Sequence, residues 1–279
     1  MTYRSKFLGA AVAFIVGLTT PALAGSVTQP GETVGVEAGA PLPPGFYYIN
    51  TSDWGCRDTK PENTCVGVTI PVLAWATPWQ IVGGRLQFLV ATPAVEVGVH
   101  NTTYLYGMYN PFVAAQLAWD LGNGFAFSYA LGGYFGVKDD VAFDTNSLNQ
   151  RFALSYVANG WDLTANAIWG IQQDGVTRTI NPDFLNVDLT ATHTIGKWEV
   201  GAVGYYSTDL NSPVAGYLKQ SQFAAGPLVG YNFGPVILQT YLTHDFYEKN
   251  YGGHDTRIWG RIVIPLGNPF APPPLHAKG

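Results

Sequence analysis

Charged residues and long apolar runs are both scarce in this chain of 279 residues, and together these shortages exclude most ordinary folds. Only 12% of the residues are charged, against about 25% in an average soluble domain. After residue 24, no stretch reaches the roughly 18 uninterrupted apolar residues of a membrane-spanning helix. A membrane protein without such helices can cross the bilayer only as a closed β-barrel. A soluble β-sandwich is the alternative that composition leaves open.

Basic residues are also few, and two of them lie in a segment that we expect to be removed. Residues 1–24 have the form of a secretory signal peptide, with Arg4 and Lys6 before an apolar run over 7–18 and small residues at 22–24. Losing two of the 14 basic residues leaves 12 against 19 acidic ones, a net charge of −7. This acidic balance argues against a nucleic-acid partner.

The chain has only two cysteines, Cys56 and Cys65, on either side of the turn-like segment 60–63. Their spacing excludes a CxxC redox or metal site. In an oxidising periplasm we expect them to form a disulfide that holds one loop. We expect no metal and no cofactor, since metal-ligand clusters and phosphate-binding glycine loops are missing from the sequence.

Glycine and proline mark five short connections along the chain, and longer polar stretches alternate with them. The short connections are Thr77-Pro78, 122–124, 159–160, 196–197 and 234–235. The long stretches are 55–65, 92–104, 138–149, 174–183, 209–221 and 248–255. Tight turns alternating with long loops are typical of outer-membrane barrels, in which the tight turns face the periplasm. The sequence therefore predicts an all-β fold over 45–266, a transmembrane antiparallel up-and-down β-barrel of about twelve strands, with both termini on the periplasmic side.

Apolar and polar residues alternate within the predicted strands, most clearly over 161–172, so one face should meet lipid and the other the lumen. The candidate lumen-lining residues are Arg85, Gln116, Arg151, Asp162, Asn166, Asp188, Glu199, Arg257 and Arg261. Two interpretations stay open. The charges could neutralise one another and fill a narrow lumen, or Arg257 and Arg261 could help line a solute path.

Aromatic residues near the connections predict two girdles at the membrane surfaces. Near the short turns lie Trp79, Trp119, Trp161 and Trp198. Near the long loops lie Tyr104, Tyr106, Tyr134, Phe135, Tyr205, Tyr206, Phe246 and Tyr247.

The sequence predicts no strand at either end of the mature chain. Residues 25–44 contain prolines that a central strand would not tolerate, so the segment is either a periplasmic leader or a plug inside the lumen. Residues 267–279 predict a flexible tail. We expect no catalytic residue, because the five histidines are isolated and no G-x-S-x-G motif occurs.

Several short motifs resemble one bacterial family. Residues 198–206 (WEVGAVGYY) resemble its "KWE-G--GYY" strand and 226–231 its "GP-VGY" strand, while 251–266 resemble its last hairpin and 43–48 its entry. This is the outer-membrane barrel family labelled for the meta-pathway of phenol degradation, often filed as transporters. The resemblance spans most of 43–266. It implies movement of aromatic or other hydrophobic compounds and specifies no catalytic residue.

We therefore expect a channel in the bacterial outer membrane for passive uptake of small hydrophobic, mainly aromatic, compounds linked to catabolism. The alternatives are a closed structural or surface-interaction barrel and a narrow general porin. The expected partners are outer-membrane lipid, lipopolysaccharide, the solute itself and, during biogenesis, the barrel assembly machinery.

Overall fold

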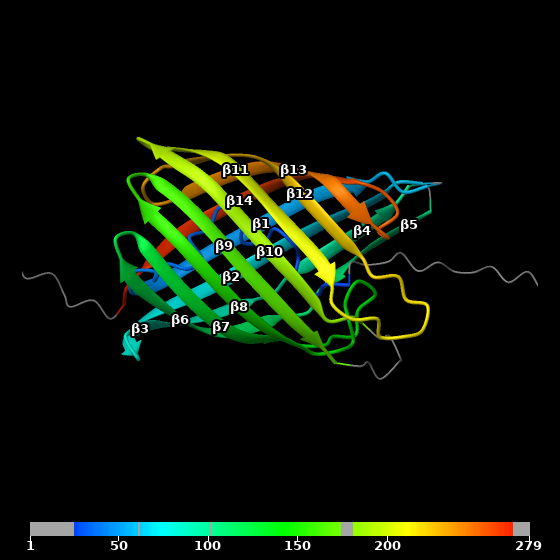
Figure 1. The fold of residues 1–279 in the computed structure, drawn as a ribbon, viewed down its shortest axis with the longest axis horizontal. Coiled ribbons are helices and arrows are strands. Elements are labelled where there is room, and N and C mark those ends of the chain that lie inside the picture. The colour runs from blue at the N-terminus through cyan, green and yellow to red at the C-terminus, as the bar shows by residue number, and fades with distance from the viewer. Residues whose placement is uncertain (1–24, 61, 101, 174–180, 270–279) are drawn as a thin grey trace, which may run out of the picture.

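The described part of the chain forms a closed antiparallel β-barrel, seen from the side in Figure 1. The computed structural model describes residues 25–60, 62–100, 102–173 and 181–269, so the predicted signal peptide and most of the predicted tail lie outside the described residues. Within those ranges, no helix has the length and apolar character needed to cross a membrane.

Strands follow one another around the barrel in chain order. They are β1 (Gly45–Arg57), β2 (Thr64–Ile81), β3 (Gly84–Ala91), β4 (Ala94–Val99), β5 (Thr103–Met108), β6 (Phe112–Gly122), β7 (Phe125–Tyr134), β8 (Ser147–Ala158), β9 (Trp161–Gln172), β10 (Phe184–Ile195), β11 (Trp198–Asp209), β12 (Ser221–Asn232), β13 (Ile237–Lys249) and β14 (Asp255–Gly267). Because β1 pairs with both β2 and β14, the sheet closes on itself.

The wall has twelve strand positions although fourteen strands are present. Both β3 and β4 pair with β2, one on each half of its length, so they follow one another along the same edge. In the same way β5 extends the line of β6 beyond the β3–β6 ladder. Proline interrupts each of these two long strands, at Pro93 and Pro111, because proline has no N–H to give to a ladder. The predicted twelve-stranded barrel is confirmed.

Four of the five predicted short turns are confirmed, and the first is wrong. Thr77 and Pro78 lie inside β2, at a bulge where the register with β3 shifts between Ala76 and Gln80. The Thr77 hydroxyl donates to the Leu86 carbonyl at 2.8 Å, which replaces a ladder bond at the bulge. The true turn is Val82-Gly83, with φ of 50° and 77°. A valine at positive φ is rare, so the available signal for this turn was the Gly83-Gly84 pair that follows it.

The predicted loop 92–104 is also wrong over most of its length. Residues 94–99 and 103–108 form the β4–β5 hairpin, which prolongs the wall at the end that carries the long loops. The chain crosses Pro93 without leaving the edge of β2, because the Thr92 N–H donates to the Pro71 carbonyl at 3.2 Å. The other predicted long loops lie between strands, although residues 174–180 of one of them fall outside the described part.

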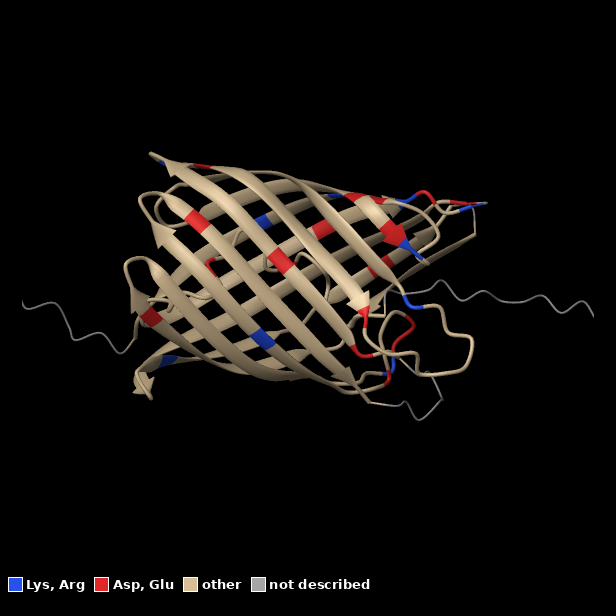
Figure 2. Ribbon diagram, viewed as in Figure 1, with Lys and Arg blue, Asp and Glu red and all other residues tan. Residues whose placement is uncertain are grey.

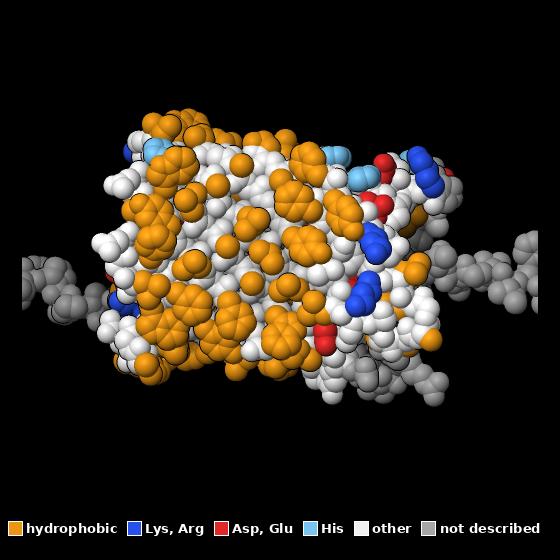
Figure 3. All heavy atoms as spheres, viewed as in Figure 1, with side chains coloured by type: hydrophobic (Ala, Val, Ile, Leu, Met, Phe, Trp, Pro, Cys, Tyr) orange, Lys and Arg blue, Asp and Glu red, His pale blue; other side chains and the backbone are white. Residues whose placement is uncertain are grey.

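The outer surface is apolar over a broad band, as Figure 3 shows. Figure 2 shows charged residues both in the loops at one end and along the strands, and those of the strands include the buried Asp188, Arg257 and Arg261. Trp79, Trp161 and Trp198 are exposed at the short-turn end, as a girdle requires. Tyr134 and Tyr205, which we assigned to the other girdle, are instead buried and face inward. The reason is strand alternation, since Tyr205 pairs with the inward-facing Asp188.

Residues 25–44 lie inside the barrel. Thr28 and Val34 are completely buried there, and backbone groups of the segment bond to side chains on the inner wall. We call residues 25–44 the lumen segment.

Candidate functional site

The inner wall of the barrel has two chemically different halves. Along β8, β9, β10, β13 and β14 the inward side chains are mostly polar or charged, and we call this the polar sector. Along β2, β3, β4 and β6 they are mostly apolar, and we call this the apolar sector. Its main members are Val66, Val68, Ile70, Val72, Leu89, Ala91, Val95, Val97 and Phe112.

The lumen segment is held chiefly by the polar sector. The Asp188 carboxylate accepts hydrogen bonds from the backbone N–H of Gly31 at 2.8 Å and of Thr33 at 2.9 Å. Glu32 forms an ion pair with Arg151 at 2.8 Å. Arg261 donates to the Glu32 carbonyl at 2.7 Å. Charged side chains thus take up backbone groups that would otherwise be buried without partners.

Towards the short-turn end, the lumen segment crosses to other strands. The Ala38 carbonyl accepts from Gln116 at 3.0 Å and from the Ser128 hydroxyl at 2.8 Å. The Leu42 N–H donates to the Gln87 amide oxygen at 3.0 Å. These bonds attach the lumen segment to β3, β6 and β7 at this end.

Between the apolar sector and the lumen segment lie two cavities. The outer cavity, at the long-loop end, has a volume of about 200 Å³. Its apolar side is built from Val66, Val68, Val95 and Val97, and Tyr109 completes it.

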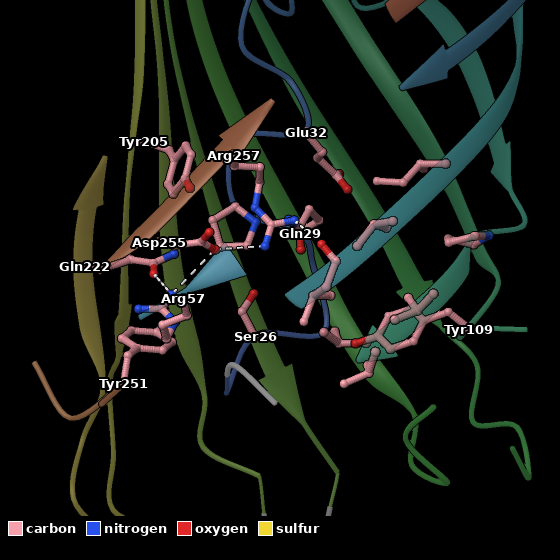
Figure 4. Close-up of a pocket in the computed structure, with 18 of the residues that line it drawn as sticks. Ser26, Gln29, Glu32, Arg57, Tyr109, Tyr205, Gln222, Tyr251, Asp255 and Arg257 are labelled. Carbon is pink, nitrogen blue, oxygen red and sulfur yellow. Dashed lines mark hydrogen bonds and ion pairs between the residues drawn. The ribbon is translucent and has the colours of Figure 1, made fainter. Parts of the chain in front are cut away.

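The opposite side of the outer cavity is polar, and Figure 4 shows how its residues surround the space. Arg57 lies 4.5 Å from the ring centre of Tyr251 and donates to Gln222 at 2.9 Å. Arg257 pairs with Asp255 at 2.8 Å. Burial raises the pKa of the Tyr251 phenol, in the loop before β14, above its usual range, so this hydroxyl stays protonated.

The inner cavity lies nearer the short-turn end and has a volume of about 160 Å³. Val72, Ala74 and Leu89 line its wall side, while Val36 and Leu42 of the lumen segment line the other. Each cavity therefore has an aliphatic wall side, formed by the apolar sector. The outer cavity is also bordered by Arg57, Asp255 and Arg257, and the inner one by Arg151 and Arg261.

All nine candidate lumen residues lie on inward faces, but they do different things. Five of them bond to the lumen segment: Gln116, Arg151, Asn166, Asp188 and Arg261. The other four bond to the wall itself, Arg85 to Thr77, Asp162 to Thr164, Glu199 to Thr192 and Gln239, and Arg257 to Asp53 and Asp255. Arg257 borders the outer cavity and Arg261 the inner one.

The sequence did not indicate the partners of these residues or the apolar sector. Glu32 belongs to residues 25–44, which the sequence left as either a periplasmic leader or a plug in the lumen. The inward face of β2 reads Val66, Val68, Ile70, Val72, while Gly67 and Thr69 face outward. The apolar residues of this stretch thus face inward, which is the reverse of the other strands, and this reversal was the available signal. Leu73 and Trp75 obscure the signal, because they are apolar residues on the outward face of the same strand.

Cys56 and Cys65 form a disulfide between directly paired residues of β1 and β2. It joins the strands at the base of the 58–63 loop, beside Arg57 of the outer cavity.

Comparison with known proteins gives one family and a group of solved barrels. The family model described as "Putative MetA-pathway of phenol degradation" matches residues 44–262. No curated protein matches the chain. The COG4313 outer membrane channel from Pseudomonas putida F1 shares 14% identity over 85% of this chain and 99% of its own, with a TM-score of 0.66. The translocator domain of the autotransporter NalP from Neisseria meningitidis shares 12% over 81% and 90%, with a TM-score of 0.48.

The second likeness is too weak to support an argument, and the first supports the fold. The family match covers most of the chain and includes every strand of the wall except the end of β14, residues 263–267. The apolar outer band, the closed wall and the alternation of short turns with long loops agree with an outer-membrane location. The chain belongs to the family described as "Putative MetA-pathway of phenol degradation", and it is a β-barrel of the bacterial outer membrane.

Proposed function

We propose that this protein is a channel through which small hydrophobic solutes, mainly single-ring aromatic compounds, enter the periplasm down their concentration gradient, with no chemical step. The observation that carries the proposal is the apolar sector of the lumen, with two cavities between it and the lumen segment.

An apolar inner wall suits a hydrophobic solute and does not suit a water-filled pore. The lumen of a general porin is polar, because it holds water and hydrated solutes. Here a continuous row of aliphatic side chains runs along the inner face of β2, from Val66 near the long loops to Ala74. A ring that moves along this row stays out of water, which is favourable in proportion to the apolar area covered.

The size of the cavities supports the same solute class. A buried apolar cavity of about 150 Å³ can hold one benzene molecule. The outer and inner cavities, at about 200 and 160 Å³, are each large enough for one such ring. A barrier of lipopolysaccharide slows hydrophobic diffusion, so a protein path would serve a cell that consumes such compounds.

Two further considerations support the proposal. The Pseudomonas putida relative is described as an outer membrane channel, and the family description refers to phenol degradation.

We also expect lipopolysaccharide to surround the outer rim and the barrel assembly machinery to insert the chain.

A closed structural barrel is the second candidate, and one observation favours it. The lumen segment is bonded to the wall along its whole length, from Gly25 to Leu42. If that segment never moves, the loops at the outer end would be the working surface.

Initial uptake by intact cells tests the proposal. Cells with the gene, without it and with the gene restored are given labelled toluene or phenol at a limiting concentration, with a small sugar as control. We expect slower aromatic uptake without the gene and unchanged sugar entry. Equal loss of both would indicate a general porin. No change in either, with the barrel present in the membrane, would rule out transport of these solutes and favour the structural barrel.

A further inference from the structure

The two cavities share a boundary, which we call the neck. Three residues border both of them: Glu32 of the lumen segment, Ile70 of β2 and Tyr134 of β7. The two cavities otherwise share no lining residue among those described. A solute that passes from one to the other must therefore pass between Ile70 and the lumen segment.

A polar network anchors the neck on the side of the lumen segment. The Glu32 carboxylate is paired with Arg151 at 2.8 Å, and only 9% of the Glu32 side chain is exposed. Arg151 also donates to the Tyr134 hydroxyl at 3.3 Å, and its guanidinium lies 4.5 Å from the ring centre of Phe112. Arg151 on β8 thus holds the Glu32 side chain, while Arg261 holds its backbone carbonyl.

The two cavities differ in which end of the barrel they approach. The outer cavity is bordered by Arg57, Thr59 and Tyr251, which belong to strand ends and loops at the outer end. The inner cavity ends at Leu42, Gln87 and Gln116, where the lumen segment is bonded to β3 and β6. A solute that arrives from outside would therefore meet the outer cavity first and the neck second.

We infer that the outer cavity is a binding site for one single-ring aromatic molecule, and that the neck of Glu32, Ile70 and Tyr134 selects by size which bound molecules pass to the inner cavity. The Glu32–Arg151 ion pair is the contact that must open for passage. This inference rests on the proposed function, because it assigns the order of events along the same path.

Filling each cavity separately tests the order of events. Val68 borders only the outer cavity and Leu89 only the inner one, so Val68→Trp and Leu89→Trp each fill one of them. Matched controls are Leu73→Trp and Val90→Trp, on the same two strands but facing lipid. Binding of labelled toluene to the purified full chain in lipid nanodiscs is measured by equilibrium dialysis, and uptake is measured in cells that carry each variant.

We expect Val68→Trp to weaken binding by about tenfold or more and to reduce uptake equally. Leu89→Trp should leave binding within about twofold of the wild type but reduce uptake by about tenfold. Both lipid-facing controls should bind and transport as the wild type does. The controls share any general cost of adding a tryptophan to a strand, so misfolding would be recognised in them and in the heat-dependent gel shift of each purified variant.

Two substitutions at the neck test the selection step, one that widens it and one that removes the Glu32–Arg151 ion pair. Ile70→Ala removes bulk at the neck, so uptake of naphthalene, which has two fused rings, should rise by about tenfold while toluene uptake changes little. Glu32→Gln removes the charge but keeps the shape, so toluene uptake should rise with unchanged affinity.

The outcomes separate the two proposals. If wild-type cells take up no aromatic compound through this protein, the proposed function fails and the inference with it. If they do, but Val68→Trp binds toluene like the wild type or Leu89→Trp loses binding to the same extent, the outer cavity is not the binding site. If naphthalene uptake by Ile70→Ala stays at the wild-type level, the neck does not select by size.

Discussion

Thr33 places both of its hydrogen-bond donors on one oxygen of Asp188. The backbone N–H lies 2.9 Å from Oδ2 and the hydroxyl lies 2.6 Å from it. The second carboxylate oxygen accepts from the Gly31 N–H. One side chain of β10 therefore fixes a whole turn of the lumen segment, and a carboxylate is the group best suited to this, since it accepts several bonds and donates none.

Asp188→Ala should loosen the lumen segment. The change leaves two buried backbone N–H groups without acceptors, at a cost of about 2–3 kcal/mol to docking of the segment. We expect higher and noisier ion conductance in planar bilayers than for the wild type. Leu189→Ala, one residue along and facing lipid, is the control and should conduct as the wild type does. Identical traces for Asp188→Ala and Leu189→Ala would show that the segment is held elsewhere.

Gly170→Ala should destabilise the barrel from within. An alanine Cβ at this position would lie 2.0 Å from the ring of Phe184, its completely buried partner on β10. Relieving this overlap by moving a packed ring costs about 1–3 kcal/mol. The temperature at which the folded band disappears on gels should fall by several degrees.

Gly260→Ala serves as the matched change for that experiment, because a Cβ at Gly260 meets nothing within 4 Å. It should leave the transition temperature unchanged. Equal shifts in the two variants would mean that any added methyl group on a strand is harmful, whatever it contacts.

Removing the disulfide should lower the free energy of unfolding moderately and leave the barrel fold intact. Cys56 and Cys65 are nine residues apart, and closing a loop of this length stabilises a fold by about 2–3 kcal/mol in the chain-entropy estimate. The double variant Cys56→Ser with Cys65→Ser should therefore unfold at lower denaturant concentration. Reduction of the wild type should produce the same shift. An unchanged midpoint would show that β1–β2 pairing already holds this loop.

Asp53→Ala should destabilise the barrel more than any of these. Asp53 pairs with Arg257 inside the wall, and both side chains are almost completely buried. Removing one member of a buried ion pair typically costs about 3–5 kcal/mol. Arg257 keeps Asp255 as a second partner at 2.8 Å, so we expect a loss at the lower end of this range.

Adding Arg257→Met to Asp53→Ala should restore part of the lost stability, since the buried guanidinium that lacks its Asp53 partner is removed, while Asp255 keeps Arg57 at 3.8 Å. Denaturant midpoints of the wild type, both single variants and the double variant give the coupling energy. Additive losses would mean that the pair contributes little beyond its separate contacts.

The strand count, the faces of most strands and four of the five short turns could be predicted because they depend on local signals. Asn159-Gly160 takes positive φ at both residues, as a two-residue hairpin turn requires, and this pattern is readable in the chain. Val82-Gly83 also takes positive φ at both residues, but valine rarely adopts positive φ. The sequence therefore favoured the nearby Thr77-Pro78 as the turn, which was wrong. Tyr134 and Tyr205 were assigned to the surface because proximity to a loop does not say to which side a strand residue points.

The candidate site was only half predictable. The charged residues of the polar sector stand out, because charge on the lipid face would be costly. The apolar sector does not stand out, since an apolar side chain is acceptable on either face of this wall.

The sequence by itself determined that the chain is a twelve-stranded barrel, because period-2 alternation and the spacing of turns act within short stretches. Only the tertiary structure decided what fills the barrel. Whether residues 25–44 lie outside or inside depends on partners more than a hundred residues away, such as Asp188 for Gly31 and Arg151 for Glu32. The two cavities lie between that segment and the apolar sector of the wall, so no local pattern could reveal them.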